Sequence, residues 1–514
     1  MSPLQLPEPC LLAVLQCCAN DSASLASAAR AHSRLHQAAV LALSSMTAYV
    51  KTQQHTDSVL MYLSKHGHHV ESLDVKGPRG DDWFQEMQLP LVYLPPNLRL
   101  RSLKVSFLNV QLQPGSGSQG IVQPGAPLER LQLYGCTLLD QVEALAAALA
   151  LLPGLQYLSV YRTFRGEDDL ELLADVFSGL RHLAYLELDD GNLMGPHKGF
   201  APSRSAMQPL KSLTQLETLR LAPHQFVVIS SSMFSGLQHL THLRLASRAI
   251  LEAVALGFAT KLQHLELGSI LGLAGTASAA AAQLLYNLQH LQHLTHLDLS
   301  ETSCFHIPPY SNPPAAAFSA ITASSKLQHL NIRRCHLPAM NRTADVWQFV
   351  FPADRQLPHL KTLDISYVKG YYPSFAAAPD GTRLVKCCPG LQSLRMLGLQ
   401  YNAELLASLQ QLSGLHTLAL FYKQYSTVIV GGDPFLIYKD VTTLESVGQM
   451  TRLSELDLHA DCHVEVLLQQ LTGLRQLTKL DCLGSLEFQP PDVHMQHVSS
   501  YLIACMSSCC MIHA

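Results

Sequence analysis

The chain has 514 residues, of which 48% are hydrophobic and 14% charged, whereas charged residues usually make up about a quarter of a soluble globular protein. About 94 of the residues are leucine. No run of apolar residues reaches the roughly 18 that a membrane span needs, and the longest, Ala144 to Leu152, is too short. The chain is also too apolar to be disordered, so its leucines are predicted to be buried against one another.

The formal net charge is -4, which leaves no basic stripe for the phosphates of a nucleic acid. The 13 cysteines are odd in number and scattered, which is typical of a reducing compartment. The segment Met1 to Cys10 contains no Lys or Arg, so a signal peptide is not expected. We therefore predict a cytoplasmic protein, with the nucleus and the cytoskeleton or ciliary axoneme as alternatives, and without membrane or nucleic-acid partners.

Residues 1–45 differ in pattern from the rest of the chain and predict a small helical module. Apolar residues recur there at helical spacing on both sides of a turn at Asn20-Asp21-Ser22. The segment is similar to the F-box, with a Leu-Pro opening, a Leu-Leu-x-Val-Leu helix and a second helix that ends in the stretch from Ala29 to His36. A plain helical cap that seals the first repeat is the alternative interpretation.

The F-box resemblance implies a partner for this module. In that family the corresponding residues contact the small adaptor subunit of a cullin-RING ubiquitin ligase. The residues of this chain that would carry the contact are Leu6, Pro7, Leu11, Leu12 and Leu15.

Residues 46–69 are predicted to link this module to the repeats. Met61 to His66 reads as a helix, and Gly67 ends it just before an apolar unit that starts at Val70.

One unit then recurs about fifteen times over residues 70–490: an apolar residue, two others, Leu, one other, and a second apolar residue. Its spacing ranges from roughly 22 to 38 residues, with a mean near 29. The units start at Val70, Leu100, Leu128, Leu155, Leu183, Leu216, Leu240, Leu262, Leu294, Leu327, Leu360, Leu391, Leu415, Leu453 and Leu477.

Alternation within each unit places two apolar side chains on one side of a short strand. Stacked strands would bury them in one continuous core, so the predicted fold class is an α/β solenoid: a horseshoe with a parallel concave sheet and a helical or irregular convex side. This pattern resembles the leucine-rich-repeat superfamily in its ribonuclease-inhibitor-like form. Cys136, Cys335 and the stretch from Cys387 to Leu394 look like its cysteine-containing subclass, which often follows an F-box. Residues 491–514 are predicted to form a C-terminal capping segment.

Histidine precedes the central leucine in four successive units, which predicts a column of imidazoles on the exposed sheet face. Two positions further on, the same face carries charged residues. Such a column could bind a metal or sense pH near neutrality, whereas the simpler interpretation is that the histidine was duplicated with the repeat. The histidines are His242, His264, His296 and His329, and the charged residues are Arg244, Glu266 and Asp298.

Aromatic residues concentrate between residues 301 and 440, and many are predicted to lie in insertions between strands. Aromatic side chains on loops of a rigid scaffold often anchor protein interfaces. The alternative is that these loops fold over the edge of the solenoid and bury their rings. The candidate partner-binding aromatics are Tyr371, Tyr372, Phe375, Tyr422 and Tyr425.

Motifs for chemistry are weak. The stretch Gly115 to Gly120 matches a dinucleotide fingerprint but lies between prolines, so it is predicted to be a flexible loop. The C-terminal Cys505, Cys509, Cys510 and His513 share a helical face with apolar residues, which favours a cap over a zinc site. No catalytic residue, cofactor, metal or small-molecule substrate is predicted.

The sequence thus predicts a non-catalytic receptor that binds a target protein through its repeats and a ligase adaptor through its first residues. The alternative is a repeat scaffold, such as a cytoskeletal or axonemal assembly protein, without a ligase role. A secreted ectodomain is disfavoured by the cysteine count, and an enzyme is the least favoured class.

Overall fold

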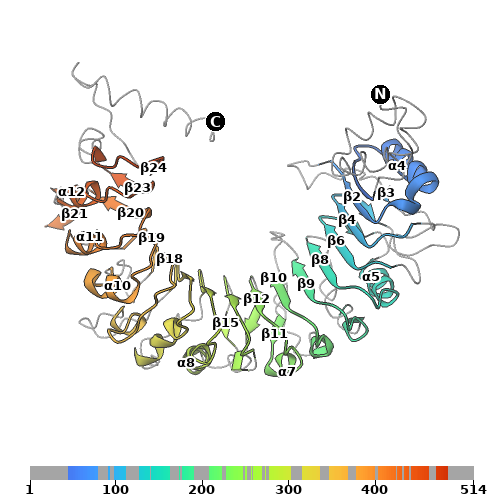
Figure 1. The fold of residues 1–514 in the computed structure, drawn as a ribbon, viewed down its shortest axis with the longest axis horizontal. Helices are drawn as coiled ribbons and strands as arrows, with labels where there is room; N and C mark the ends of the chain where they lie inside the picture. The colour runs from blue at the N-terminus through green and yellow to red at the C-terminus, as the bar shows by residue number, and fades with distance from the viewer. Residues whose placement is uncertain are drawn as a thin grey trace, which may run out of the picture. The chain divides into compact units, whose positions relative to one another are not determined.

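Two compact units make up the chain in a computed structural model (Figure 1): unit 1, Met1–Ala259, and unit 2, Thr260–Ala514. The described residues, to which every structural statement below refers, are 44–78, 91–92, 98–110, 127–138, 141–161, 173, 176–189, 208–222, 227–246, 249–251, 256–257, 259–268, 272–273, 277–302, 315–335, 347–368, 378–399, 403–423, 425–430, 433–438, 442–461 and 471–483.

Unit 1 contains one parallel sheet of eight strands, each hydrogen-bonded to the next. Their order in the sheet follows their order in the sequence, as expected of stacked repeats. The strands are β1 (Ser45–Tyr49), β2 (Ser72–Lys76), β4 (Ser102–Ser106), β6 (Arg130–Tyr134), β8 (Tyr157–Tyr161), β9 (Tyr185–Asp189), β10 (Thr218–Ala222) and β12 (His242–Leu245).

Unit 2 repeats this arrangement with eight further parallel strands. They are β14 (His264–Glu266), β16 (His296–Asp298), β17 (His329–Asn331), β18 (Thr362–Asp364), β19 (Ser393–Met396), β20 (Thr417–Lys423), β23 (Glu455–Asp461) and β24 (Lys479–Leu483). All fifteen predicted units therefore form strands, which confirms the predicted fold class.

Short helices and turns connect the strands and lie on one side of the sheet in each unit (Figure 1). In unit 1 they are α4 (Gln53–His66), η2 (Gly67–His69), α5 (Gln141–Ala150), η3 (Gln208–Ser212) and α7 (Ser231–Phe234), with short strands β3 (Leu91–Val92), β5 (Asn109–Val110), β7 (Thr137–Leu138), β11 (Val227–Ile229) and β13 (Ala249–Leu251). In unit 2 they are β15 (Gly272–Leu273), α8 (Ala277–Leu288), η6 (Ala315–Thr322), α9 (Trp347–Val350), α10 (Gly381–Cys387), α11 (Ala403–Leu409), α12 (Thr442–Gly448) and a hairpin of β21 (Tyr425–Val430) and β22 (Asp433–Tyr438).

The core lies between the sheet and these helices. The central leucines of neighbouring strands pair in register, as Leu131 does with Leu158 and Leu158 with Leu186, and all three are fully buried. Burial of one such side chain contributes about 1.5–3 kcal/mol. On the helical side, Leu145 and Leu149 of α5 are buried at helical spacing. Burial in this core thus explains the high leucine content of the sequence.

The predicted linker over residues 46–69 is wrong in its first part. Ser45–Tyr49 forms strand β1, which pairs with β2, so the sheet starts one repeat earlier than expected. The leucine pattern does not reveal this strand because its inward positions hold Met46 and Ala48. The rest of the segment is helical as predicted, and α4 begins at a cap where Thr52 accepts a hydrogen bond from the amide of His55.

In three repeats, the residue eight positions after the start of the unit donates a buried side-chain hydrogen bond to the preceding repeat. Cys136 donates from Sγ to the carbonyl of Val105 at 3.3 Å, and Cys335 donates to that of Leu299 at 2.8 Å. In the repeat that starts at Leu294, the hydroxyl of Thr302 donates to the carbonyl of Leu267 at 2.6 Å. Each acceptor is the last apolar residue of the preceding unit. Threonine and cysteine therefore fill the same structural role.

Thr302→Val is expected to lower the free energy of unfolding of unit 2 by about 1–2 kcal/mol, because a buried carbonyl loses its donor while the side-chain volume is kept. Urea unfolding measures the change. The matched control is Thr295→Val, since Thr295 makes a similar bond to the carbonyl of Gln263 at 2.9 Å in an exposed position. Equal losses for the two variants would contradict this role.

Some predictions concern residues outside those described. They are the helical module up to residue 43, the loop Gly115–Gly120, the aromatics Tyr371, Tyr372 and Phe375, and the capping segment 491–514. The five proposed adaptor-binding residues belong to the first of these.

Candidate functional site

The sheet of unit 1 carries a ladder of aromatic and guanidinium groups on the side opposite the leucines. The rings of Tyr157 and Tyr185 are stacked, with centroids 4.1 Å apart and 6° between their planes. The guanidinium of Arg130 lies 5.5 Å from the centre of the Tyr157 ring, and that of Arg220 lies 5.8 Å from the Tyr185 ring. We call Arg130, Tyr157, Tyr185 and Arg220 the tyrosine ladder.

Glu187 contacts two members of the tyrosine ladder, Tyr185 and Arg220. One carboxylate oxygen, Oε2, accepts hydrogen bonds from the hydroxyl of Ser159 at 2.8 Å and from that of Tyr185 at 3.0 Å. The other, Oε1, lies 3.6 Å from Nη1 of Arg220. Burial raises the pKa of Tyr185, and so do its hydrogen bond with Tyr157 and the charge of Glu187. The hydroxyl therefore stays protonated and serves as a donor at every physiological pH.

A second group of aromatic rings lies further along the same strands. Tyr134 and Tyr161 are stacked with centroids 4.5 Å apart, and the ring of Phe107 meets Tyr134 edge-on at 5.0 Å. Tyr134 is 36% exposed. At the end of the sheet, Tyr49 is 70% exposed and its ring lies 5.2 Å from Nζ of Lys76. Aromatic rings thus occur along much of this face.

The parallel register produces the tyrosine ladder. Tyr157 and Tyr185 both directly precede the central leucine of their repeat, so in-register pairing of β8 with β9 places one ring on the other. Arg130 holds the same position in β6. This surface was not predicted from the sequence, because the predicted aromatic anchors were residues of loops. The signal was present, since the two tyrosines recur at one repeat position just as the histidines do.

In unit 2 the same repeat position holds the predicted imidazole column. His264 pairs with His296 and His296 with His329, with ring centroids 4.9 Å and 4.2 Å apart and interplanar angles of 26° and 22°. The column is therefore confirmed for these three strands. His242 occupies the equivalent position of β12 in unit 1, where it pairs with Thr218.

In several strands of unit 2 a carboxylate directly follows the central leucine. Glu266 pairs with Asp298 in the register of β14 and β16, and Asp298 accepts a hydrogen bond from the side-chain amide of Asn331 at 2.8 Å. Arg244 holds the same repeat position in unit 1 and pairs with Arg220. The predicted charged residues thus lie on sheet faces, as expected.

Further along unit 2, Arg395 bridges two of these carboxylates. Its guanidinium lies 3.8 Å from Asp364 on the neighbouring β18 and 3.0 Å from Asp457 on β23. Strand β20 lies between β19 and β23, and its residue at this position is Ala419. The small side chain leaves room for the arginine to reach across.

Unit 2 is expected to lose stability as the pH falls. Burial, and then the charge of Lys361, lower the pKa of His329 in the folded state. Below the ordinary pKa of about 6.5 the unfolded chain therefore binds more protons at this residue than the folded one. The contribution of His329 to stability is complete above that pH and is lost as the pH falls toward the folded pKa. The urea concentration at the midpoint of unfolding should decrease between pH 7.5 and pH 5.5, and this decrease should be smaller in His329→Thr than in the wild type.

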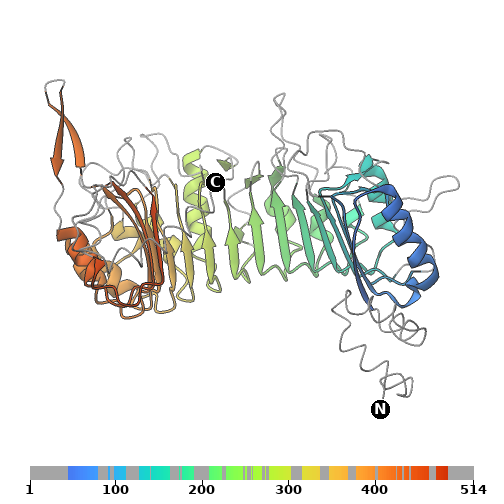
Figure 2. The same cartoon turned by 90° about the horizontal axis from the view of Figure 1, so that it is seen from above.

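The predicted aromatic anchors that the structure describes differ in setting. Tyr422 lies within strand β20, where it pairs with Ala460, so its assignment to an insertion was wrong. Tyr425 begins the antiparallel hairpin of β21 and β22, which projects from the sheet of unit 2 (Figure 2). Strand β20 includes Tyr422 because its pairing with β23 extends as far as Lys423.

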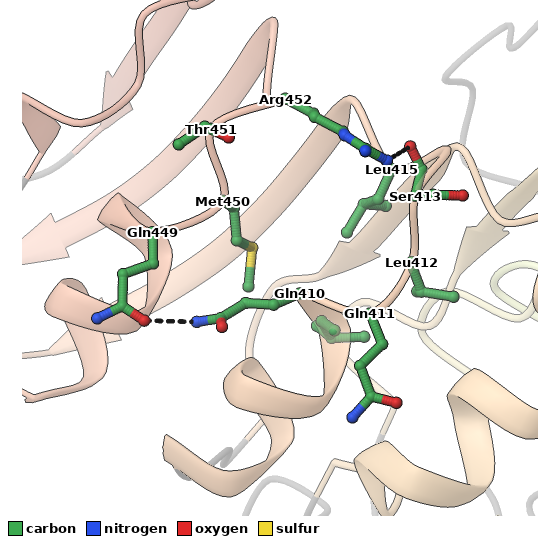
Figure 3. Close-up of a pocket in the computed structure, with 10 residues that line it drawn as sticks. Gln410, Gln411, Leu412, Ser413, Leu415, Gln449, Met450, Thr451 and Arg452 are labelled. Carbon is green, nitrogen blue, oxygen red and sulfur yellow. Dashed lines mark hydrogen bonds between the residues drawn. The ribbon is translucent and has the colours of Figure 1, made fainter.

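A cavity of about 280 Å³ lies beside the turns that follow α11 and α12 (Figure 3). Two pairs of its polar groups bond to each other: Arg452 donates to the carbonyl of Ser413 at 2.7 Å, and Gln410 donates to the side chain of Gln449 at 3.1 Å. Its lining residues include the hydroxyl side chains Ser413 and Thr451 but no His, Cys, Asp, Glu or Lys. It lies between two successive repeats.

Among the described residues, no group of three or more His, Cys, Asp or Glu side chains is placed to hold a metal ion. The same part of the chain contains no helix with the length and apolar character needed to cross a membrane.

The buried leucines, the parallel register and the closing hydrogen bonds together define the fold. Each unit is an α/β solenoid, with one parallel strand per repeat and a leucine-lined core. No protein-family model and no curated protein matches the sequence. Among solved structures, a leucine-rich-repeat protein of Leptospira interrogans is 16% identical over 85% of this chain and 95% of its own, with a TM-score of 0.37. A TDR receptor is 14% identical over 86% of this chain and 68% of its own, with a TM-score of 0.42.

Proposed function

We propose that the chain is a protein-binding scaffold and that its target binds the sheet face of unit 1, over the tyrosine ladder. The observation that carries the proposal is the stacked pair Tyr157 and Tyr185 between two arginines. Tyrosine and arginine are enriched among the residues that dominate protein interfaces. The proposal assigns no catalytic step to the chain.

The construction of the tyrosine ladder supports binding. Each ring is held by its neighbour and by an arginine, and the Tyr185 hydroxyl is fixed on Glu187. Side chains that are ordered before binding lose little conformational entropy when a partner arrives. The hydroxyls, the guanidinium groups and the carboxylate also give a target both donors and acceptors beside apolar ring edges.

A site-specific photocrosslinker tests the position of the surface. Gln132 is suited to carry it, since it lies on the same face as Tyr157 and pairs with Ser159 on β8. The matched control position is Leu151, which directly follows α5 on the helical side and is 36% exposed. We expect discrete protein adducts from position 132 that position 151 does not give. Identical adducts from both positions would refute the proposal.

We further propose that the target is presented to a ubiquitin ligase through an F-box-like module in residues 1–45. The support is the sequence resemblance alone. Leu11→Asp/Leu12→Asp should abolish recovery of the ligase adaptor, whereas Tyr157→Ser/Tyr185→Ser should leave it unchanged. Recovery that is equal in the wild type and the Leu11/Leu12 variant, or absent from both, would favour a scaffold without a ligase role.

A further inference from the structure

Three stacked imidazoles on adjacent strands are the feature of unit 2 that the proposed function does not use. We call His264, His296 and His329 the imidazole ladder, and we propose that it is a proton-sensitive element that binds protons in coupled steps and loosens strands β14, β16 and β17 in acid. The inference concerns unit 2 alone and does not depend on the target of unit 1.

The geometry couples the three rings. His296 is stacked on His264 at 4.9 Å on one side and on His329 at 4.2 Å on the other. A proton on one ring therefore places a positive charge within 5 Å of the next, and like charges at that distance disfavour a second protonation. Groups coupled in this way titrate as a set rather than as independent residues.

Some charged groups around the imidazole ladder favour its protonation, and others disfavour it. Glu266 and Asp298 follow two residues after His264 and His296 on the same strands, and their charges favour the first proton. On the neighbouring β18, Thr362 lies beside His329. Lys361 directly precedes Thr362, and its charge disfavours protonation of His329. Asp364 lies two residues after Thr362 on the same strand. Asn331 is the uncharged member on β17.

The hydroxyl of Thr295 lies 2.9 Å from Nδ1 of His296 and also bonds the carbonyl of Gln263 at 2.9 Å. Movement of a charged His296 ring would therefore disturb a contact between two repeats. In unit 1, His242 and Arg244 hold the repeat positions that correspond to His264 and Glu266. The carboxylate that favours the first proton in unit 2 is thus replaced by a cation there, which confines the proposed element to unit 2.

The chain itself supplies a tolerated replacement for the central ring. Thr218, Thr362 and Thr417 occupy the same position in β10, β18 and β20, so His296→Thr keeps a side chain that these repeats accept. It leaves His264 and His329 two strands apart, at about 10 Å, where direct stacking is impossible. His359→Thr is the control, because His359 is exposed and precedes its strand in the connecting turn.

The test is a pH titration of the full chain labelled with ¹³C in its histidine rings, followed by NMR from pH 8 to 4.5. Resonances that disappear in the single variants identify the imidazole ladder. We expect the wild-type ladder to take up its protons over at least about three pH units, against about two for a one-proton group. In His296→Thr the two remaining rings should each titrate within about two pH units, and His359→Thr should match the wild type.

Hydrogen exchange gives the second readout. Between pH 7.5 and 5, after correction for intrinsic rates, protection of segments 289–302 and 324–335 should fall at least about threefold more in wild type than in His296→Thr. Three one-proton titrations in the wild type, or titration widths that are the same with and without His296, would overturn the coupling. Equal loss of protection in the two proteins would overturn the loosening.

Discussion

Tyr157→Ser/Tyr185→Ser is expected to weaken target binding by at least about 100-fold, because truncation of a central aromatic anchor commonly costs 2 kcal/mol or more. Both side chains are half-buried on the sheet face, so their loss empties the middle of the tyrosine ladder and leaves Arg130 and Arg220 without the rings they cover. Yield of the photocrosslinked adducts from position 132, titrated against chain concentration, measures the effect.

Two variants separate binding from folding. Tyr185→Phe keeps the stacked ring and removes only the hydroxyl that donates to Glu187, so it should retain most of the affinity. Tyr286→Ser removes an exposed tyrosine on α8, where 54% of the residue is accessible, and should have no effect. Wild-type affinity in the double variant, with an unchanged circular dichroism spectrum, would contradict the proposed site.

Gly236→Ala is expected to destabilise unit 1 by about 2–3 kcal/mol, the upper part of the range for overpacking a filled space. A methyl group at Gly236 would overlap the backbone carbonyl of Lys211 in the preceding repeat. Backbone atoms cannot move aside as a flexible side chain can, so the two repeats would have to separate. Urea unfolding followed by circular dichroism measures the loss.

Gly154→Ala is the matched control for that change. Gly154 lies in the corresponding turn before β8, and no atom lies within 4 Å of the position its methyl group would take. Alanine there should raise the free energy of unfolding by about 0.4–1 kcal/mol, because it restricts the unfolded chain. Opposite signs for the two glycines are expected. Destabilisation of similar size in both would show that repeat contact is not the cause.

The repeat pattern predicted the sheet well because each strand has a distinctive sequence. Leucine at the central position and a second apolar residue two places on recur in all fifteen predicted units. The central leucines are buried in every unit but the last, which enforces one register. Strand β1 could not be found in this way, since Met46 and Ala48 fill its inward positions. Strand β1 keeps the alternation of inward and outward residues but lacks the leucines that identify the other strands.

The candidate sites were predicted less evenly. The histidine column followed directly from repeat position, and the stacking of His264, His296 and His329 agrees with it. Tyr157 and Tyr185 also share one repeat position, so their stacking follows from the same periodicity. By contrast, contacts that skip a strand, such as that between Arg395 and Asp457, depend on side-chain length and on a small residue between them. Sequence spacing alone does not specify them.

The buried cysteine thiols make it possible to measure local opening separately in each unit. Cys136 lies in unit 1, and Cys335, Cys387 and Cys388 lie in unit 2, all with reduced and buried sulfur. Burial raises the pKa of Cys136 to about 12, so neither exposure nor thiolate is present in the folded state. Alkylation at each site then requires local opening, and its rate, measured for each peptide, gives the opening frequency of each unit without an engineered cysteine.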